Sequence, residues 1–237
     1  MQSLADVMKD LERLGTEQTR KTFARHGAPI DQMFGVKVGD LKTISKKIKG
    51  QQDLALELYD TGNSDAMYLA GMVANGALMT KKQLESWAKN STWHMISDYT
   101  VPGVACESPF AAELAQKWIN AKQPLIIGSG WTTWSGIVAM QADDQLDLAV
   151  IESLLQRVVD NVHTSPNRVR YTMNGFVISV GGYVLPLQKK AKAAAKKIGD
   201  VQVDVGQTEC RVPNAVEYID KMIARGNAGK KRKTIKC

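Results

Sequence analysis

The chain has 237 residues, of which 44% are hydrophobic and 23% are charged, a composition typical of a soluble globular protein. No apolar run approaches the roughly 20 residues that a membrane-spanning helix needs, which argues against an integral membrane protein. The three cysteines and the three histidines are scattered without metal-ligand spacing, so we expect no metal site, no cofactor, and reduced thiols in the cytoplasm.

The positive charge of the chain is unevenly distributed. The formal net charge is +7, and the segment from Lys221 to the C-terminus carries seven basic residues and no acidic one. The rest of the chain is therefore neutral, and residues 51–160 form an acidic middle with thirteen Asp/Glu against six Lys/Arg. The high isoelectric point does not by itself indicate a nucleic-acid-binding groove, so any such surface must be local.

Amphipathic runs with capping signals predict helices along nearly the whole chain. Ser64, Thr80 and Ser108 open three of them, the last with Pro109 at the first helical position. The alternation over Val201–Val205 has no pairing partner and predicts an extended linker. The predicted helices are Ser3–Leu14, Thr16–His26, Val38–Lys49, Gln52–Tyr59, Ser64–Ala74, Thr80–Asn90, Thr92–Val101, Ser108–Asn120, Pro124–Gln141, Leu146–His163, Pro166–Val184, Leu185–Ile198 and Pro213–Arg225.

Two tryptophan-bearing segments stand out, NSTWHMISDY at Asn90–Tyr99 and GWTTWS at Gly130–Ser135. The first resembles the W-x-x-x-D helix of the AlkD-type DNA alkylation repair proteins, HEAT-like glycosylases that remove positively charged alkylated purines. FGVKVGDLKTISKKI at Phe34–Ile48 and WINAK at Trp118–Lys122 are similar to other parts of the same family, and the similarity covers roughly residues 1–200. With the helix count, the resemblance implies an all-α fold.

The resemblance implies a HEAT-like or ARM-type solenoid of paired antiparallel helices, although no fixed sequence period is present. We expect residues 1–225 to form one domain and residues 226–237 a basic, flexible tail. It also implies a monomer that binds double-stranded DNA, alkylated or otherwise damaged, through a basic concave surface and an aromatic cleft.

The sequence departs from the family at two catalytic positions. The family's aspartate falls on Ser97, while Asp98 lies one residue later and about 100° further round a regular helix. The family's arginine, expected near residues 128–129, is absent. Trp93, Ser97 and Asp98 are the candidate catalytic residues, and we expect the catalytic step to be weak or lost.

The aromatic residues admit two interpretations. Trp93, Trp131 and Trp134 could line a cleft that stacks on a nucleobase or shields a cationic one, or they could pack in the core between adjacent helices. His94 and Asp98 are four residues apart and could form an orienting pair for a general base, or only a hydrogen bond on a helix surface.

Two basic segments are candidates for DNA binding. Arg168, Arg170 and Asn174 head an otherwise apolar helix and could reach phosphates or a base edge, or satisfy carbonyl groups and nearby aspartates. The Leu185–Ile198 helix gathers its lysines on an arc of about 160°, which fits either a phosphate backbone or a solvated face. Those lysines are Lys189, Lys190, Lys192, Lys196 and Lys197.

Three functions remain open from the sequence: an AlkD-like protein acting on alkylated DNA with altered chemistry, a non-catalytic nucleic-acid-binding HEAT module, and a scaffold whose acidic middle binds a basic partner. Phosphate binding weakens steeply with salt, which separates the first two functions from the third. Release of bases from alkylated duplex DNA separates the first from the second.

Overall fold

The computed structural model describes residues 2–236, and within that range no residue lies in a β-strand. The all-α fold predicted from the capped amphipathic runs is therefore confirmed. The chain forms two compact units, the first built from residues up to Phe110 with Val205–Glu209 and Lys236, and the second from Ala111–Asp204 and Cys210–Ile235. None of the helices in residues 2–236 is long and apolar enough to cross a membrane.

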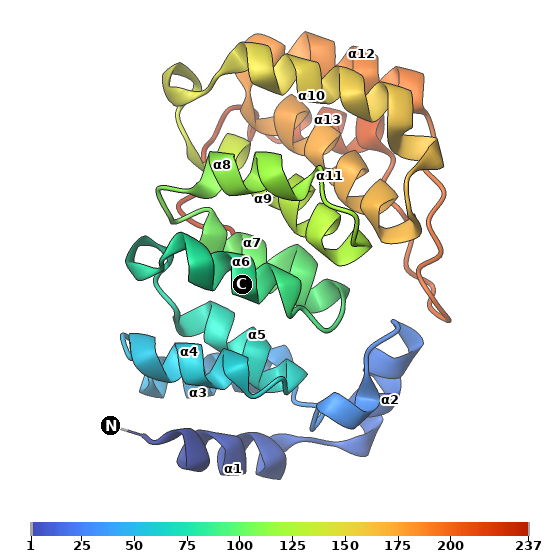
Figure 1. Ribbon diagram of the computed structural model, residues 1–237. Helices are drawn as coiled ribbons and strands as arrows, with labels where there is room; N and C mark the ends of the chain where they lie inside the picture. The colour runs from blue at the N-terminus through green and yellow to red at the C-terminus, as the bar shows by residue number, and fades with distance from the viewer. Residues whose placement is uncertain (1, 237) are drawn as a thin grey trace. The chain divides into compact units, whose positions relative to one another are not determined.

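The first unit consists of short helices, of which the consecutive helices α4 and α5 pack most closely on each other (Figure 1). Its elements are α1 (Leu4–Leu14), α2 (Glu17–Arg25), η1 (Ile30–Gln32), α3 (Val38–Lys47), α4 (Gln52–Asp60), α5 (Ser64–Val73), η2 (Gly76–Leu78), α6 (Lys81–Lys89), η3 (Ile96–Thr100) and α7 (Val101–Ala105).

Helix α5 is the core helix of the first unit. Its sequence is apolar on nearly all sides, so it is buried from Ser64 to Gly71 and contacts α3, α4 and η3. It begins after Asn63, whose side chain accepts hydrogen bonds from the backbone N–H groups of the first turn. A Cβ atom added at Gly71 would lie 2.6 Å from Cγ2 of Thr100, so the glycine permits the close approach of η3.

A buried carboxylate at the start of α5 holds the segment between η1 and α3. Asp65 accepts hydrogen bonds from the backbone N–H groups of Phe34, Gly35 and Val36 at 2.7, 2.9 and 3.1 Å. Burial raises the pKa of the Asp65 carboxyl, against the opposing effect of these three donors. The three bonds satisfy amide groups that would otherwise be buried without partners.

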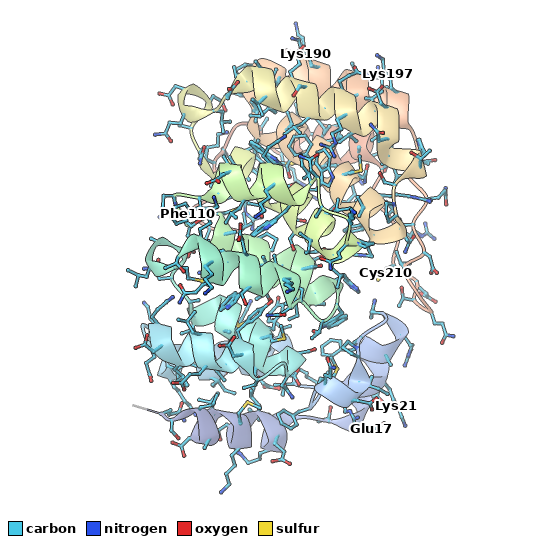
Figure 2. All side chains as sticks on the ribbon, viewed as in Figure 1. Glu17, Lys21, Phe110, Lys190, Lys197 and Cys210 are labelled. Atoms are coloured by element: carbon cyan, nitrogen blue, oxygen red, sulfur yellow. The ribbon has the colours of Figure 1, made fainter. Side chains whose placement is uncertain are left out.

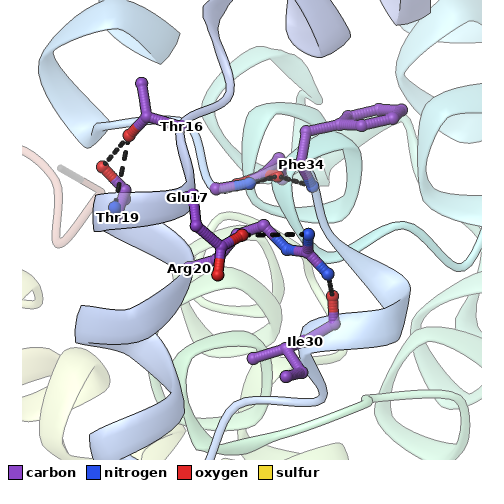
Figure 3. Close-up of polar contacts among 8 residues, drawn as sticks. Thr16, Glu17, Thr19, Arg20, Ile30 and Phe34 are labelled. Carbon is purple, nitrogen blue, oxygen red and sulfur yellow. Dashed lines mark hydrogen bonds and ion pairs between the residues drawn. The ribbon is translucent and has the colours of Figure 1, made fainter.

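Helix α2 is fixed to the same segment. The Thr16 side chain caps α2 by accepting from the Thr19 N–H at 3.2 Å, and the Thr16 N–H donates to the Gly35 carbonyl at 3.0 Å. Figure 3 shows Arg20 between Glu17 and Ile30, with its guanidinium 3.3 Å from the Glu17 carboxylate and donating to the Ile30 carbonyl at 3.0 Å. These contacts set the orientation of the helix that reaches Trp93.

The second unit contains two long buried helices and a covering set of amphipathic ones (Figure 1). Its elements are α8 (Ala111–Trp118), α9 (Pro124–Met140), η4 (Asp143–Gln145), α10 (Leu148–Asn161), η5 (Val162–Thr164), α11 (Asn167–Tyr183), η6 (Leu185–Leu187), α12 (Gln188–Ile198) and α13 (Ala215–Ala224).

Helices α9 and α11 pack on each other over most of their length, and small residues let other helices approach them. A Cβ atom added at Gly130 of α9 would lie 2.6 Å from the backbone nitrogen of Ile119, just after α8. A Cβ atom added at Gly181 of α11 would lie 2.4 Å from the Ile219 side chain of α13. One added at Gly182 would lie 2.4 Å from the Met222 side chain of the same helix. The absence of a side chain at these two glycines lets α13 approach α11 closely.

The basic tail is held by hydrogen bonds in this structure. In the second unit the Gly229 N–H donates to the Gly182 carbonyl at 2.9 Å, and the Arg232 N–H donates to the Ala139 carbonyl at 2.8 Å. The Lys231 ammonium lies 2.8 Å from the Asp143 carboxylate and 2.9 Å from the Val138 carbonyl. It therefore satisfies a carbonyl near the C-terminal end of α9, where a cation is electrostatically favoured.

The last described residue of the tail has a similar role in the first unit. Lys236 donates to the Ala74 carbonyl, at the C-terminal cap of α5, and lies 2.7 Å from the Glu107 carboxylate. Glu107 also accepts from the Gly76 N–H at 3.1 Å. Two tail lysines, Lys231 and Lys236, thus each contact a helix C-terminus and a carboxylate of their own unit.

Most predicted helix boundaries agree with the structure to within two or three residues. Two start signals were wrong. The residue that caps α5 is Asn63 and not Ser64, which is the first residue of the helix. Helix α8 begins at Ala111, so Pro109 lies before the helix, and the Ser108 hydroxyl instead accepts from the Phe110 N–H at 3.2 Å. Residues 201–205 carry no regular secondary structure, as the linker prediction requires. The largest difference is in the segment predicted as a single helix over Thr92–Val101.

Candidate functional site

The candidate catalytic segment is a π-turn and not a regular α-helix. Over Ile96–Thr100 the backbone hydrogen bonds span five residues instead of the four of an α-helix. The Val101 N–H, for example, donates to the Ile96 carbonyl. Such turns hold one more residue than an α-helical turn, are rare, and are frequent at functional sites. The expectation that Asp98 points about 100° away from the catalytic direction assumed a regular helix, and the extra residue in this turn removes that assumption.

Ser97 and Asp98 lie together inside the first unit. The Ser97 hydroxyl donates to Oδ1 of Asp98 at 2.8 Å. Ser97 is 0% exposed and Asp98 only 4% exposed. The Asp98 carboxyl group therefore lies beside the tryptophan segment, accepts a hydrogen bond from the neighbouring hydroxyl and is shielded from solvent.

Trp93, the tryptophan of the motif, is a packed residue at 6% exposure. Its ring lies 5.7 Å from that of Phe23 on α2 and 4.9 Å from the His94 ring. It borders a cavity of about 20 Å³, which Phe23 and Asp65 also line. That volume holds about one water molecule, so it is far too small for a purine base.

The other two tryptophans of the predicted cleft lie in the core of the second unit. Trp131 is 1% exposed and packs against Phe176, with ring centroids 5.4 Å apart, while Trp134 is also buried. The indole N–H groups of Trp93 and Trp134 have no hydrogen-bond partner among the described residues. Each of the three tryptophans is buried within its own unit, which favours the core-packing interpretation over an open aromatic surface.

Helix α9 offers no cation at the position where the family has its arginine. Gly128 and Ser129 are buried there, and the Ser129 hydroxyl donates to the Leu125 carbonyl at 3.2 Å. Arg157 of α10 lies 5.7 Å from the Trp131 ring, but its guanidinium donates to Asn120 Oδ1 and to the Ile119 carbonyl, both at 2.8 Å. This arginine therefore has a structural role in the second unit.

The polar residues at the head of α11 mostly contact backbone carbonyl groups. Arg170 donates to the Ser165 carbonyl at 2.7 Å and to the Gln202 carbonyl at 3.4 Å. Asn174, almost fully buried, donates to the Pro213 carbonyl at 2.8 Å. These contacts support the alternative in which both residues satisfy carbonyl groups. The Arg168 guanidinium lies 4.4 Å from the Tyr171 ring, and a role for it in DNA binding stays a prediction.

The lysines of α12 divide into two groups. Lys190 forms an ion pair with Glu152 of α10, and Lys192 forms one with Asp220 of α13. Lys189, Lys196 and Lys197 are exposed and have no ion pair among the described residues. Figure 2 shows Lys190 and Lys197 at the outer surface of this unit.

Three features of the site were not predicted from the sequence. The sequence carries one sign of the π-turn: Asp98 lies one residue later than the position of the family's aspartate. A π-turn holds one extra residue, which is consistent with such a displacement. The exposed ring of Tyr99, at 42%, has no signal in the hydrophobic pattern. The acidic partners of Lys190 and Lys192 come from distant helices and are also not visible in the local sequence.

The sequence of the chain matches a family of DNA repair proteins. The family model described as DNA alkylation repair enzyme matches residues 7–191. An uncharacterized protein of Listeria innocua is 35% identical over 223 residues, covering 92% of this chain and 96% of that protein. One of Listeria monocytogenes is 35% identical over 217 residues, covering 90% and 93%.

A solved structure matches over the full length of both chains, with 37% identity and a TM-score of 0.90. It is described as a new family of proteins related to the HEAT-like repeat DNA glycosylases with affinity for branched DNA structures. The matches confirm the resemblance that the tryptophan motifs indicate, and they confirm the HEAT-like fold.

Proposed function

Because this chain belongs to the DNA alkylation repair enzyme family, we propose that it binds distorted or branched double-stranded DNA and excises alkylated purines weakly or not at all. The affinity for branched DNA described for the solved relative supports the choice of substrate. The altered residues at the motif support the loss of chemistry.

One observation carries the proposal: Ser97, which the resemblance aligns with the family's carboxylate, donates a hydrogen bond to the buried Asp98. Excision of a cationic base needs stabilisation of positive charge as it develops on the sugar, which a carboxylate directed at that sugar supplies. Here the Asp98 carboxyl group is covered, and the cavity that Trp93 borders has room for only about one water molecule.

Affinity for DNA requires cations that can approach phosphates. Lys189, Lys196 and Lys197 of α12 are suited to this, because they are exposed and carry no ion pair among the residues that the structure describes. Contacts of this kind are independent of sequence, so they allow binding without readout of base edges.

The acidic middle is a weaker basis for a function in binding basic protein partners. Three of its carboxylates already contact lysines of this chain: Glu107 with Lys236, Asp143 with Lys231, and Glu152 with Lys190. These pairs reduce the charge that the region presents to another protein.

The proposal is tested by fluorescence anisotropy with a linear duplex, a three-way junction and a four-way junction of matched length at several salt concentrations. We expect binding to all three DNAs, tightest to the two junctions. The logarithm of the affinity should fall linearly with the logarithm of the salt concentration. Absence of binding at low salt, or binding that salt does not weaken, would overturn the proposal and favour the scaffold hypothesis.

A further inference from the structure

One face of α3 in the first unit combines two lysines with a glycine and a threonine. On a regular helix Gly39, Lys42, Thr43 and Lys46 fall within an arc of about 100°, and all four residues are exposed. The buried residues of α3 lie on the opposite side, where the helix packs against α1 and α5. These four residues, called the α3 face below, therefore point away from the core of the unit.

The two lysines of the α3 face are not neutralised by acidic side chains. Neither Lys42 nor Lys46 has an ion pair among the residues that the structure describes. The positions three and four residues away from each lysine hold no Asp or Glu, and the two lysines are themselves four residues apart. Like charges at this spacing repel each other and destabilise a helix. The helix dipole favours a cation at Lys46, in the last turn, but not at Lys42, in the middle of the helix.

Gly39 leaves the backbone of the α3 face bare, although neither packing nor backbone conformation requires a glycine there. A Cβ atom added at Gly39 would lie in open space, and the φ angle of this residue is not positive. Glycine is less favourable than alanine within a helix. A glycine beside two lysines has a different use, because it lets an anion come close to the backbone while the ammonium groups reach it from the side.

A phosphate backbone is the anion that suits the α3 face. The Cβ atoms of residues four apart on a helix are about 5–6 Å from each other, and the long flexible stem of lysine lets both ammonium groups reach neighbouring phosphates. The Thr43 hydroxyl, which makes only a long 3.5 Å hydrogen bond to the Gly39 carbonyl, is a further donor of the kind that contacts phosphate oxygens. The α3 face carries no aromatic or amide side chain that would read a base.

We propose that the α3 face binds the phosphate backbone of DNA, so that the first unit takes part in DNA binding as well as the lysines of α12 in the second. The inference rests on the proposed function and adds a contact surface in the unit that carries the Trp93 motif. Phosphate groups are present in linear and branched DNA alike, so the α3 face supplies affinity and not preference for junctions.

The test variant is Lys42→Gln, Lys46→Gln, and the same unit offers a control of equal charge, Lys9→Gln, Lys47→Gln. Both control lysines are exposed, but each lies near an aspartate of α1. Arg13 lowers the pKa of Asp10 by a hydrogen bond, and the charge of Lys47 lowers this pKa further. Lys9 lies three residues after Asp6 on α1. These acids compete with phosphates for the control lysines.

Anisotropy titrations with a linear duplex and a three-way junction of equal length are carried out at several salt concentrations. We expect Lys42→Gln, Lys46→Gln to weaken binding to both DNAs about 3-fold to 30-fold and to flatten the slope of log affinity against log salt by up to about 2. The control should stay within about 2-fold of wild type. Gly39→Gln, which adds a neutral side chain in open space, should weaken binding while urea denaturation stays unchanged.

A second readout needs no variant: bound DNA should slow the chemical acetylation of Lys42 and Lys46 in the wild-type protein but not that of Lys47, as mass spectrometry measures. Unchanged binding by Lys42→Gln, Lys46→Gln, or an equal loss in the control, overturns the role of the α3 face while DNA binding stands. Loss of binding to phosphatidylserine vesicles with unchanged DNA binding would assign the face to a membrane surface and also overturn it. Wild-type protein that binds neither DNA would instead refute the proposed function, so the failures are distinguishable.

Discussion

The Ser97 hydroxyl donates a 2.8 Å hydrogen bond to the carboxylate of Asp98, its neighbour in the chain, inside a π-turn where both side chains are buried. Neighbouring residues on a regular helix do not face each other. The bond is therefore a consequence of the local change in helix geometry. It joins Ser97, which the resemblance aligns with the family's catalytic residue, to the carboxyl group of Asp98.

Ser97→Ala should destabilise the first unit. It removes a donor to a buried carboxylate without creating a large cavity, which we expect to lower the free energy of unfolding by about 1–3 kcal/mol. Urea denaturation followed by circular dichroism measures the change. Ser135→Ala is the control, because the Ser135 hydroxyl only donates to the Trp131 carbonyl of its own helix and should matter by less than about 1 kcal/mol. An equal effect of the two variants would contradict the special role of the Ser97 bond.

Release of N3- and N7-methylpurines from duplex DNA should be weak or absent in the natural protein, because Asp98 is covered and Ser97 cannot stabilise positive charge on the sugar. Ser97→Asp should not restore activity. It would place two carboxylates side by side in a buried turn, where one of them keeps its proton.

The measurement is time-resolved base release, with binding of the same duplex recorded in parallel to show that the substrate is engaged. Robust release by the natural protein that Asp98→Asn abolishes would show that Asp98 performs the family's chemistry. The loss of catalysis in the proposed function would then be wrong, although DNA binding would stand.

Much of the fold could be predicted because its helices are specified locally. Thr80 and Gln83 form a reciprocal capping box at the start of α6, and Ser3 and Asp6 form one at α1. Such signals need only a few neighbouring residues. The division into two units could not be predicted, because it depends on contacts between distant segments, such as Val205–Glu209 with the first unit.

The site was less predictable for a related reason. The helical-wheel argument at Ser97 and Asp98 assumed 3.6 residues per turn, whereas the packed structure widens this turn where Thr100 lies against Gly71. The lysine face of α12 was visible in the sequence, but the acids that pair with Lys190 and Lys192 lie 38 and 28 residues away. Both the widened turn and the ion pairs of α12 depend on contacts between residues far apart in the sequence, so local sequence patterns do not reveal them.

Neutralising Lys189, Lys196 and Lys197 to Gln should weaken binding to linear and branched DNA alike. Each phosphate contact contributes about 0.9 to the slope of log affinity against log salt, so losing three should flatten the slope by up to about 3. The matched control is the double variant Lys190→Gln, Lys192→Gln, whose lysines already pair with carboxylates and should affect the slope less. Anisotropy titrations at four salt concentrations measure both. If the control flattens the slope as much as the triple variant, the ion pairs do not persist in solution.

Lys236→Met should destabilise the first unit, because the tail lysine contacts both the Ala74 carbonyl at the end of α5 and the Glu107 carboxylate. Its side chain is only 15% exposed and that of Glu107 25%, so the pair is more shielded than a surface ion pair. Removing the cation leaves a partly buried carboxylate and a helix carbonyl without this partner, which we expect to lower the free energy of unfolding by about 1–3 kcal/mol.

Urea denaturation and limited proteolysis of the tail measure the effect of Lys236→Met. Lys233→Met is the control, because Lys233 lies in the same tail, is exposed, and has no ion pair among residues 2–236. The double variant Lys236→Met, Glu107→Gln should recover part of the loss, since the carboxylate that lost its partner is then uncharged. Equal stability and equal protease sensitivity of the two single variants would mean that the tail is detached in solution and that its lysines are available for DNA.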